Sequence, residues 1–195
     1  MPPKAKFTRE EIIDAALSIV KENGFDALTA RALGEKLGSS ARPVFTVFRS
    51  MEEVQEEVIN AARKLYDSYV LRGLNCTQQN VPRFKRVGEQ YIRFAICEPK
   101  LFQLLFMKEQ ENMPEFAGIL PVIDNNYEEI LKSIEDGYGL KRDSALNLYR
   151  HLWVYTHGIA SLCATKMCAF GGEEISKMMT EVFLSLLKNQ EAHND

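Results

Sequence analysis

The stretch ARALGEKLGSSARPVFTVF, residues 30–48, contains two short segments of helical character joined by the sequence GSS. In the first segment, residues 30–37, Leu33 and Leu37 lie four positions apart, which places both on one face of a helix. The second segment, residues 41–48, has an apolar side and a polar side when it is drawn as a helix. The stretch therefore predicts two short helices with a tight turn between them.

The residues that flank and interrupt these segments agree with the prediction. Thr29 and Ser40 are suitable N-caps for the two helices. Pro43 would lie in the first turn of the second helix, where no intrahelical donor is lost. Gly34 costs the first helix about 1 kcal/mol of helix propensity, which is tolerable if another backbone must pass close by.

The second short helix is expected to present a polar, cationic face to its surroundings. Arg42, Thr46 and Arg49 gather on one side of it, opposite Val44, Val47, Phe48 and Met51. A short helix, a turn containing glycine and a second short helix with a cationic outer face make a helix-turn-helix, whose second helix enters the major groove of DNA. A plain helical corner without a DNA-binding role is the alternative.

Helices are also expected on both sides of this pair. Thr8 with Glu11 has the capping-box pattern, and the apolar stripe that follows ends at Gly24. Ser50 with Glu53 repeats the pattern, so a long helix should begin there and run to about residue 71. Its predicted apolar positions are Val54, Val58, Ala61, Leu65 and Tyr69.

The remainder of the chain has helical period and no sustained alternation of period two, which predicts an all-α fold. The polar residues 72–80 are typical of a linker, and residues 111–125, with two prolines, of a loop. We expect a three-helix helix-turn-helix DNA-binding domain in residues 1–51 and a larger helical domain in residues 52–195. Helices of the second domain are predicted from Pro82, from Pro99, before Gly139, at 141–169 and at 173–189.

Charge is distributed unevenly along the chain. The net charge is −3 and the pI about 5.7, which for the whole chain argues mildly against a nucleic-acid partner. Residues 1–50, however, hold eight basic and six acidic side chains, whereas the other residues hold sixteen basic and twenty-one acidic ones. A slightly basic N-terminal part on an acidic body is compatible with one end that approaches phosphates.

Several protein classes are disfavoured by composition. Four cysteines lack the spacing of a metal site or a secreted scaffold, and the N-terminus has no apolar signal segment, so we expect a cytoplasmic protein. Residues 152–170 are too polar for a membrane span. No catalytic triad, paired carboxylate motif or phosphate loop is present, so no catalytic residue, metal or cofactor is expected. A helical enzyme or small-molecule carrier remains an alternative.

Residues 7–54 resemble the N-terminal DNA-binding domain of the TetR (tetracycline-repressor) family of transcriptional regulators. The resemblance rests on an ordered set of residues: Thr8, Ile12, Ala15, Ala16, Leu17, Gly24, Phe25, Thr29, Arg31, Leu33, Leu37, Gly38, Ser40, Phe45, Phe48 and Ser50. It implies a homodimer whose third helices enter successive major grooves of a near-palindromic, double-stranded operator. Phe45 and Met51 depart from the family, which usually has tyrosine and lysine there as phosphate contacts.

The candidate DNA-binding residues divide into two groups. Arg42 and Thr46 are expected to face the groove, while Thr29, Arg31, Ser40 and Arg49 are expected to fix the register on the backbone. Lys4 and Lys6 could add phosphate contacts from the N-terminal tail. Alternatively, Thr29 and Ser40 only cap helices, and Arg31 and Arg49 only pair with surface acids.

The last two predicted helices carry apolar residues on more than one face, so each needs two partners. A second copy of the chain can supply the additional partner, because a two-fold interface uses one patch twice. The family resemblance likewise implies a homodimer through these two helices. The stretch LWVYTHGIASL also resembles a pattern with Trp, His and Gly in the C-terminal domain of one branch of the family.

Aromatic residues of the second domain are candidates for a pocket that binds a small apolar effector, although each is also a plausible core residue. They are Phe84, Tyr91, Phe94, Phe102, Phe106, Trp153 and His157. The leading interpretation is a repressor that leaves its operator when it binds such an effector. A regulator that responds to oxidation of Cys163 and Cys168 is a second interpretation, although a spacing of five residues on a helix makes their side chains diverge.

Overall fold

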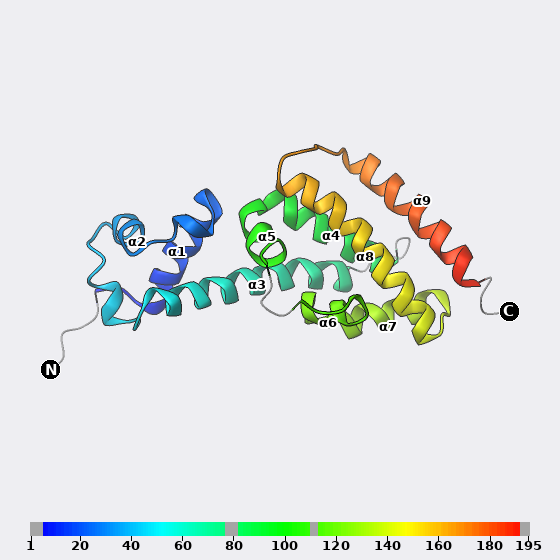
Figure 1. Cartoon of the computed structure of the whole chain (residues 1–195), viewed down its shortest axis with the longest axis horizontal. Coiled ribbons are helices and arrows are strands. Elements are labelled where there is room, and N and C mark those ends of the chain that lie inside the picture. The colour runs from blue at the N-terminus through cyan, green and yellow to red at the C-terminus, as the bar shows by residue number, and fades with distance from the viewer. Residues whose placement is uncertain (1–5, 77–81, 110–112, 192–195) are drawn as a thin grey trace. The chain divides into compact units, whose positions relative to one another are not determined.

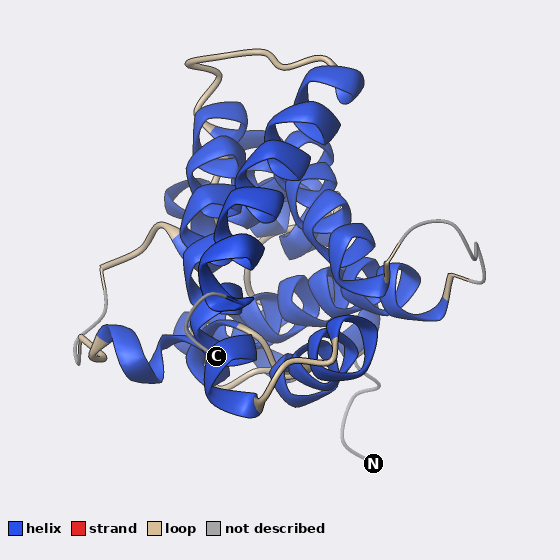
Figure 2. Ribbon diagram, turned by 90° about the vertical axis from the view of Figure 1, so that its right-hand side faces the viewer, coloured by secondary structure: helices blue, strands red, loops and turns tan. Residues whose placement is uncertain are grey.

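The structure, a computed structural model, describes residues 6–76, 82–109 and 113–191. The described chain is helical throughout, with connecting turns and no β-strand in those ranges (Figures 1 and 2), which confirms the all-α class. Contacts between residues divide the chain into two compact units. We call residues 1–65 with 98–108 the head unit, and residues 66–97 with 109–195 the body unit.

This division differs from the single boundary after residue 51 that the sequence suggests. Helix α3 (Met51–Asn75) is continuous, so it contributes its first part to the head unit and its last part to the body unit. Helix α5 (Pro99–Phe106) belongs to the head unit because it packs against α1 (Arg9–Asn23). Glu98, directly before α5, forms an ion pair of 3.1 Å with Lys21 of α1.

The head unit begins with the expected capping box. Thr8 Oγ1 accepts from the amide of Glu11 at 3.1 Å, and the Glu11 carboxylate accepts from the amide of Thr8 at 2.8 Å. The unit also contains η1 (Phe25–Ala27), α2 (Ala30–Lys36) and η2 (Val44–Thr46), where η denotes a 3-10 helix. Its core consists of fully buried apolar side chains from α1, α2, η2, α3 and the turn between η2 and α3, among them Ile12, Ala16, Val20, Leu33, Val44, Phe48, Val54 and Val58.

The body unit is a bundle in which α4 packs chiefly against α8, α7 packs on both, and α9 packs on α8. Its elements are α4 (Arg83–Cys97), η3 (Phe116–Gly118), α6 (Ile119–Ile123), α7 (Tyr127–Tyr138), α8 (Arg142–Ala164) and α9 (Gly172–Glu191). The last part of α3 approaches α4 closely at Gly73, where an added Cβ would lie 2.9 Å from the backbone of Val87.

Three details of the predicted helices were wrong. The expected loop at 111–125 contains η3 and α6, because Pro121 is only the third residue of α6 and removes no helical hydrogen bond. Helix α8 ends at Ala164 and not near 169, because Lys166 adopts a left-handed conformation with φ of 59°. The first residues of the supposed linker 72–80 continue α3 to Asn75, and residues 77–80 lie outside the described residues.

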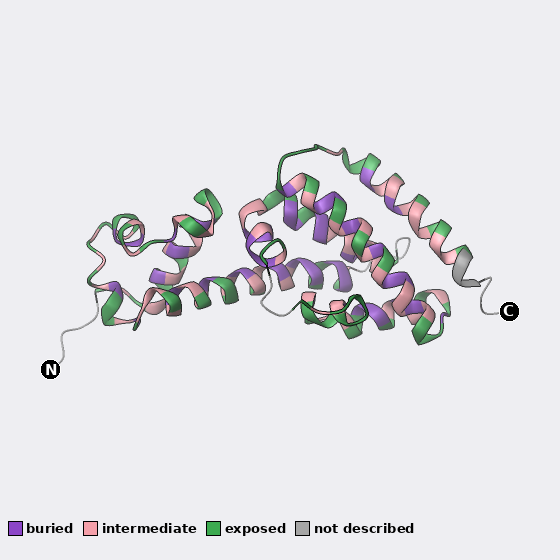
Figure 3. Ribbon diagram, in the orientation of Figure 1, coloured by how far each residue is buried: buried purple, intermediate pink, exposed green. Residues whose placement is uncertain are grey.

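The buried face of α3 also differs from the predicted stripe. Ala61 and Leu65 are only half-buried, whereas Ala62 and Tyr66 are buried. Burial recurs every four residues along the helix, through Val54, Val58, Ala62, Tyr66, Val70 and Leu74 (Figure 3). Tyr66 therefore faces the interior of the body unit.

Candidate functional site

Helix α2 and the turn after it have well-defined ends. Thr29 caps α2 as expected, because its Oγ1 accepts from the amide of Ala32 at 3.1 Å. Gly38 is left-handed with φ of 62°, and the amide of Ser39 donates to the carbonyl of Gly34 at 2.9 Å. This arrangement is a Schellman motif, which ends the helix and reverses the chain toward η2.

Gly34 is needed for the close approach of this turn to α2. A Cβ built on Gly34 would lie 2.7 Å from the amide nitrogen of Ala41 and 2.8 Å from the carbonyl carbon of Ser40. Both neighbours are backbone atoms, which cannot move aside as a side chain can. The glycine inside α2 thus allows the backbone of 39–41 to pass directly over the helix.

The second element of the pair is shorter than the helix predicted for residues 41–48. It is a single 3-10 turn, Val44–Thr46, with Pro43 at the N-cap position and no side-chain cap, so Ser40 is not its N-cap. The Pro43 carbonyl accepts from both the amide of Thr46, at 3.2 Å, and the Thr46 hydroxyl, at 2.7 Å. Thr46 therefore takes the place of Val47, whose amide would donate to this carbonyl in an α-helix.

Arg9 anchors this element to the helices on either side. Its guanidinium lies 4.3 Å from the centre of the Phe48 ring and pairs with Glu53 at 3.1 Å and Glu57 at 2.8 Å. The other oxygen of Glu53 accepts from the amide of Arg49 at 2.7 Å. These donors lower the pKa of the Glu53 carboxyl below its ordinary value, the Arg49 amide most strongly.

All six candidate DNA-binding residues are exposed on this stretch of the head unit: Thr29, Arg31, Ser40, Arg42, Thr46 and Arg49. Several of them also have a local partner. Thr29 caps α2, Arg31 pairs with Glu35 at 2.9 Å, and Thr46 donates to Pro43. The side chains of Arg42 and Arg49 form no ion pair within 4.0 Å among the residues that the structure describes, although the charge of Arg49 helps to lower the pKa of Glu53.

The lysines near this stretch have local partners of different kinds. Lys36 is neutralised by Glu22 across 2.7 Å, which joins α2 to α1. Lys6 donates to the hydroxyl of Ser39 at 3.0 Å, so it lies beside the turn. Lys4 lies outside the described residues. Phe45 is 44% exposed, so this departure from the family pattern lies on the surface.

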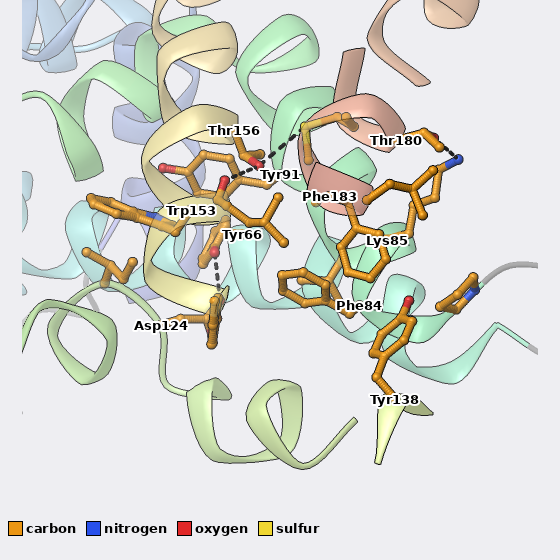
Figure 4. Close-up of a pocket in the computed structure, with 18 residues that line it drawn as sticks. Tyr66, Phe84, Lys85, Tyr91, Asp124, Tyr138, Trp153, Thr156, Thr180 and Phe183 are labelled. Carbon is orange, nitrogen blue, oxygen red and sulfur yellow. Dashed lines mark hydrogen bonds between the residues drawn. The ribbon is translucent and has the colours of Figure 1, made fainter. Parts of the chain in front are cut away.

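The body unit encloses a cavity of about 270 Å³ (Figure 4). Aromatic side chains from α3, α4, α7, α8 and α9 form much of its wall, namely Tyr66, Phe84, Tyr91, Tyr138, Tyr149, Trp153 and Phe183. Aliphatic and sulfur-containing side chains such as Val87, Leu152 and Met179 complete the apolar part. A concave, largely apolar cavity with a few polar groups has the character of a small-molecule site.

One polar feature of the wall is a buried carboxyl. Asp124 Oδ2 accepts from the hydroxyl of Tyr66 at 2.8 Å, and its Oδ1 accepts from the amide of Asn126 at 2.8 Å. Burial raises the pKa of Asp124 above its ordinary value, although these hydrogen bonds oppose the shift. Burial also raises the pKa of Tyr66 well above its ordinary value, so its phenol keeps its proton.

A second polar feature is Lys85 of α4, whose ammonium donates to the hydroxyls of Ser176 at 3.1 Å and Thr180 at 3.2 Å, both on α9. The Tyr91 hydroxyl is 2.8 Å from Nδ1 of His157, whose ring stacks on Trp153. Burial lowers the pKa of His157, which favours the neutral imidazole.

The structure separates the seven aromatic ligand-binding candidates. Phe84, Tyr91 and Trp153 line the cavity, and His157 lies outside the lining but contacts Tyr91 and Trp153. Phe94 is fully buried against Tyr66 and Tyr69, outside the lining. Phe102 and Phe106 belong to α5 in the head unit and are therefore not cavity residues.

Sequence reasoning missed Tyr66, Lys85 and Asp124. Tyr66 was excluded by the wrong stripe on α3, although its spacing of four from Ala62 was a usable signal. Asp124 was assigned to a loop, and no residue spacing connects it with Tyr66, which is 58 positions away. Lys85 has no signal of its own in the sequence, where it resembles a surface lysine.

The cysteines of the redox interpretation do not form an activated pair. Cys163 is half-buried near the end of α8, and burial raises the pKa of its thiol, which disfavours the reactive thiolate. Cys168 is exposed beyond the helix. Within the described ranges, no cluster of three or more His, Cys, Asp or Glu side chains could hold a metal, and no helix has the length and apolar character to cross a membrane.

Comparison with known proteins agrees with this geometry. Residues 12–58 match the family model described as bacterial regulatory proteins, tetR family, and residues 84–183 match the tetracyclin repressor-like C-terminal domain. The chain is also 23% identical, over 177 residues, to a Bacillus subtilis (strain 168) protein named uncharacterized HTH-type transcriptional regulator YobS. The alignment covers 89% of this chain and 87% of that protein.

An all-α chain with a helix-turn-helix in the head unit and a helical body defines a class of DNA-binding transcriptional regulators. The two family matches identify the family within that class: the chain belongs to the TetR family. The helix-turn-helix interpretation of residues 30–48 is thereby confirmed over that of a plain helical corner.

Proposed function

We propose that this TetR-family regulator is a cytoplasmic, homodimeric repressor that leaves a near-palindromic operator when a small, largely apolar effector occupies the body cavity. The observation that carries the DNA-binding part is the pair Arg42 and Arg49. Both are exposed beside η2 and form no ion pair within 4.0 Å among the described residues. Cations left unpaired on such an element can bind phosphates or base edges without first breaking an ion pair.

The six candidates take different roles in this proposal. Arg42 reads the groove, and Thr46 offers a methyl group and a hydroxyl oxygen that still has an acceptor position. Arg49, Arg31, Ser40 and Thr29 fix the register on phosphates. Arg49 stands in for the lysine that Met51 replaces, since its amide is already fixed by Glu53.

The effector part of the proposal rests on the connectivity of the cavity wall. Tyr66 lies in the wall and belongs to α3, the helix that begins directly after η2. Helix α4 also lines the cavity and leads through Glu98 into α5, which packs on α1. Displacement of either wall helix therefore has a covalent path to the head unit. A coupling free energy of about 1–3 kcal/mol would change operator affinity by about 5- to 150-fold.

The proposed dimer uses α8 and α9. Val154, Gly158 and Leu162 recur every four residues on α8 and are exposed, with open space around Gly158. Most of α9 is half-buried or exposed although it is rich in apolar residues (Figure 3). A glycine between two exposed apolar residues lets another helix approach closely, and a two-fold copy would cover this face.

The DNA-binding part is tested by fluorescence anisotropy with labelled DNA from the region that flanks the protein's own coding sequence. If the dimer neutralises about eight phosphates, log affinity should fall with log salt at a slope near −7. Footprinting should show two protected half-sites about one helical turn apart. A slope near zero with every fragment would overturn the DNA-binding part.

The effector part is tested on the same complex. Small molecules are screened for release of labelled DNA, and each active compound is tested for quenching of Trp153 fluorescence, because Trp153 is the only tryptophan of the chain and lines the cavity. Compounds that release DNA should quench Trp153. Release by compounds that leave Trp153 fluorescence and the melting temperature unchanged would contradict an effector site in this cavity.

A further inference from the structure

The polar groups of the cavity wall differ in how many of their hydrogen-bonding positions have a partner in the protein. The carboxylate of Asp124 accepts from Tyr66 on one oxygen and from the backbone and side-chain amides of Asn126 on the other, at 2.8, 2.8 and 3.3 Å. Three of its roughly four acceptor positions are therefore filled by the protein's own donors, so it has little capacity left for a ligand that donates hydrogen bonds.

Lys85 is in the opposite situation. Its ammonium has three N–H groups and donates to two neutral hydroxyls, those of Ser176 and Thr180. Among the described residues, no carboxylate lies within the 4.0 Å of an ion pair with it. The side chain is nevertheless half-buried and forms part of the apolar wall. A partly desolvated cation with one donor to spare favours an anionic partner.

Trp153 provides a second unused donor. Its Nε1–H is buried and has no acceptor within the part of the chain that the structure describes. Buried indole N–H groups normally find an acceptor, so the missing acceptor marks an unmet polar requirement beside the cavity. Lys85 and Trp153 thus both lack a full set of acceptors, and Lys85 carries positive charge.

The location of these groups gives the ligand an orientation. Figure 4 shows Lys85 beside Thr180 on one side of the wall and the Tyr66–Asp124 pair on the other. An anionic head group at Lys85 is therefore kept away from the Asp124 carboxyl. The cavity of about 270 Å³ has room for about eleven non-hydrogen atoms, scaled from the six of benzene in an engineered cavity of about 150 Å³.

We infer that the cavity selects an amphiphilic organic anion, a monocarboxylate with an apolar body, whose carboxylate binds Lys85 and whose body lies among the aromatic rings of the wall. The inference names the chemical class of the proposed effector and so rests on the proposed function of the cavity. It predicts that head-group charge, and not only apolar size, determines affinity.

The first test uses decanoate, decanamide and decylamine below micelle formation, because the three share one alkyl chain and differ in head-group charge. Dissociation constants are measured by Trp153 fluorescence and checked by calorimetry. Decanoate should bind about tenfold or more tightly than decanamide, the gain from a hydrogen bond to a charged group, and decylamine should bind most weakly. Equal affinities, preference for decylamine or no binding of decanoate would overturn the inference.

Three variants assign the preference to one residue. Lys85→Gln should remove the advantage of decanoate over decanamide and leave decanamide within about twofold of the wild type, while Lys85→Arg should retain the advantage. Lys132→Gln, at an exposed lysine of α7, is the matched control and should change neither constant. Unchanged decanoate affinity in a folded Lys85→Gln protein would contradict the assignment.

Operator release separates this inference from the proposed function. Decanoate that binds with the predicted preference but leaves the protein on labelled DNA would contradict the proposed ligand response and support the head-group assignment. DNA release by neutral or cationic compounds that quench Trp153, with decanoate inactive, would support the proposed response and overturn the head-group assignment.

Discussion

Tyr66 and Asp124 are 58 residues apart and are joined by a 2.8 Å hydrogen bond from the phenol to the carboxylate. The bond ties α3 to the segment that follows α6, within the wall of the cavity. Asp124 is 4% exposed, so the carboxylate depends on protein donors for its solvation. Two predictions concern this pair.

Asp124→Asn should make stability less dependent on pH. Because burial raises the pKa of Asp124 in the folded state, the folded protein binds more protons there than the unfolded chain between the two pKa values. The contribution of this group to the free energy of unfolding is therefore present at low pH and is lost as pH rises through the folded pKa. The variant should gain stability relative to the wild type from about pH 4 to pH 7.

This prediction is measured by urea denaturation across that pH range. Asp136→Asn, at an exposed aspartate of α7, is the control and should give a curve parallel to the wild type. A stability difference for Asp124→Asn that stays constant, or shrinks as pH rises, would show that the carboxyl is not destabilised by burial.

Tyr66→Phe should lower the free energy of unfolding by about 1–3 kcal/mol, the cost of leaving a buried acceptor without its donor. The same variant should raise the pKa of Asp124 further, because a hydrogen bond that favours the charged form is removed. Tyr155→Phe on α8, a half-buried tyrosine outside the cavity lining, should cost less than about 0.5 kcal/mol. Equal losses in both variants would contradict a special role for the pair.

Gly34→Ala should destabilise the head unit by about 2–3 kcal/mol, because the new methyl group would meet backbone atoms of Ser40 and Ala41. Operator affinity should fall with it, since the same backbone leads into η2. Gly137→Ala is the matched control, as open space surrounds that glycine in α7, and should raise stability by up to about 1 kcal/mol. Thermal melting measures both, and a neutral Gly34→Ala would contradict the close approach.

Val154→Glu should convert the proposed dimer to monomer, because it places a charge on the exposed face of α8. Val122→Glu makes the same change at a comparably exposed valine of α6 and should leave the dimer intact. Sedimentation velocity of the folded variants distinguishes the two masses. A dimeric Val154→Glu protein would exclude this face of α8 as an essential part of the interface.

The elements that local sequence patterns determine were predicted correctly. The caps at Thr8 and Thr29 and the close approach at Gly34 follow from residues within a few positions, and the structure contains all three. The long helix after Ser50 was also correct, although its buried stripe was misplaced. A small error in the assumed angle per residue accumulates along a helix of 25 residues, and it was enough to leave Tyr66 out of the predicted buried stripe.

The details that depend on competing or distant partners could not be predicted. At η2 the Pro43 carbonyl accepts from the amide and the hydroxyl of Thr46 and not from an α-helical partner, a competition that residue spacing does not show. The separation of Phe102 and Phe106 from the cavity depends on α5 packing against α1. The Tyr66–Asp124 pair requires α3 to meet the segment that follows α6, and nothing in either local sequence indicates it.

The central claim is that the helix-turn-helix binds DNA through unpaired cations beside η2. The most direct measurement compares the wild type, Arg42→Ala and Arg93→Ala by anisotropy on the same operator DNA, where Arg93 is an exposed arginine of α4 in the body unit. We predict that Arg42→Ala lowers specific affinity by about tenfold or more while Arg93→Ala binds as the wild type does. Equal affinity of Arg42→Ala and wild type, or an equal loss in both variants, would contradict the account.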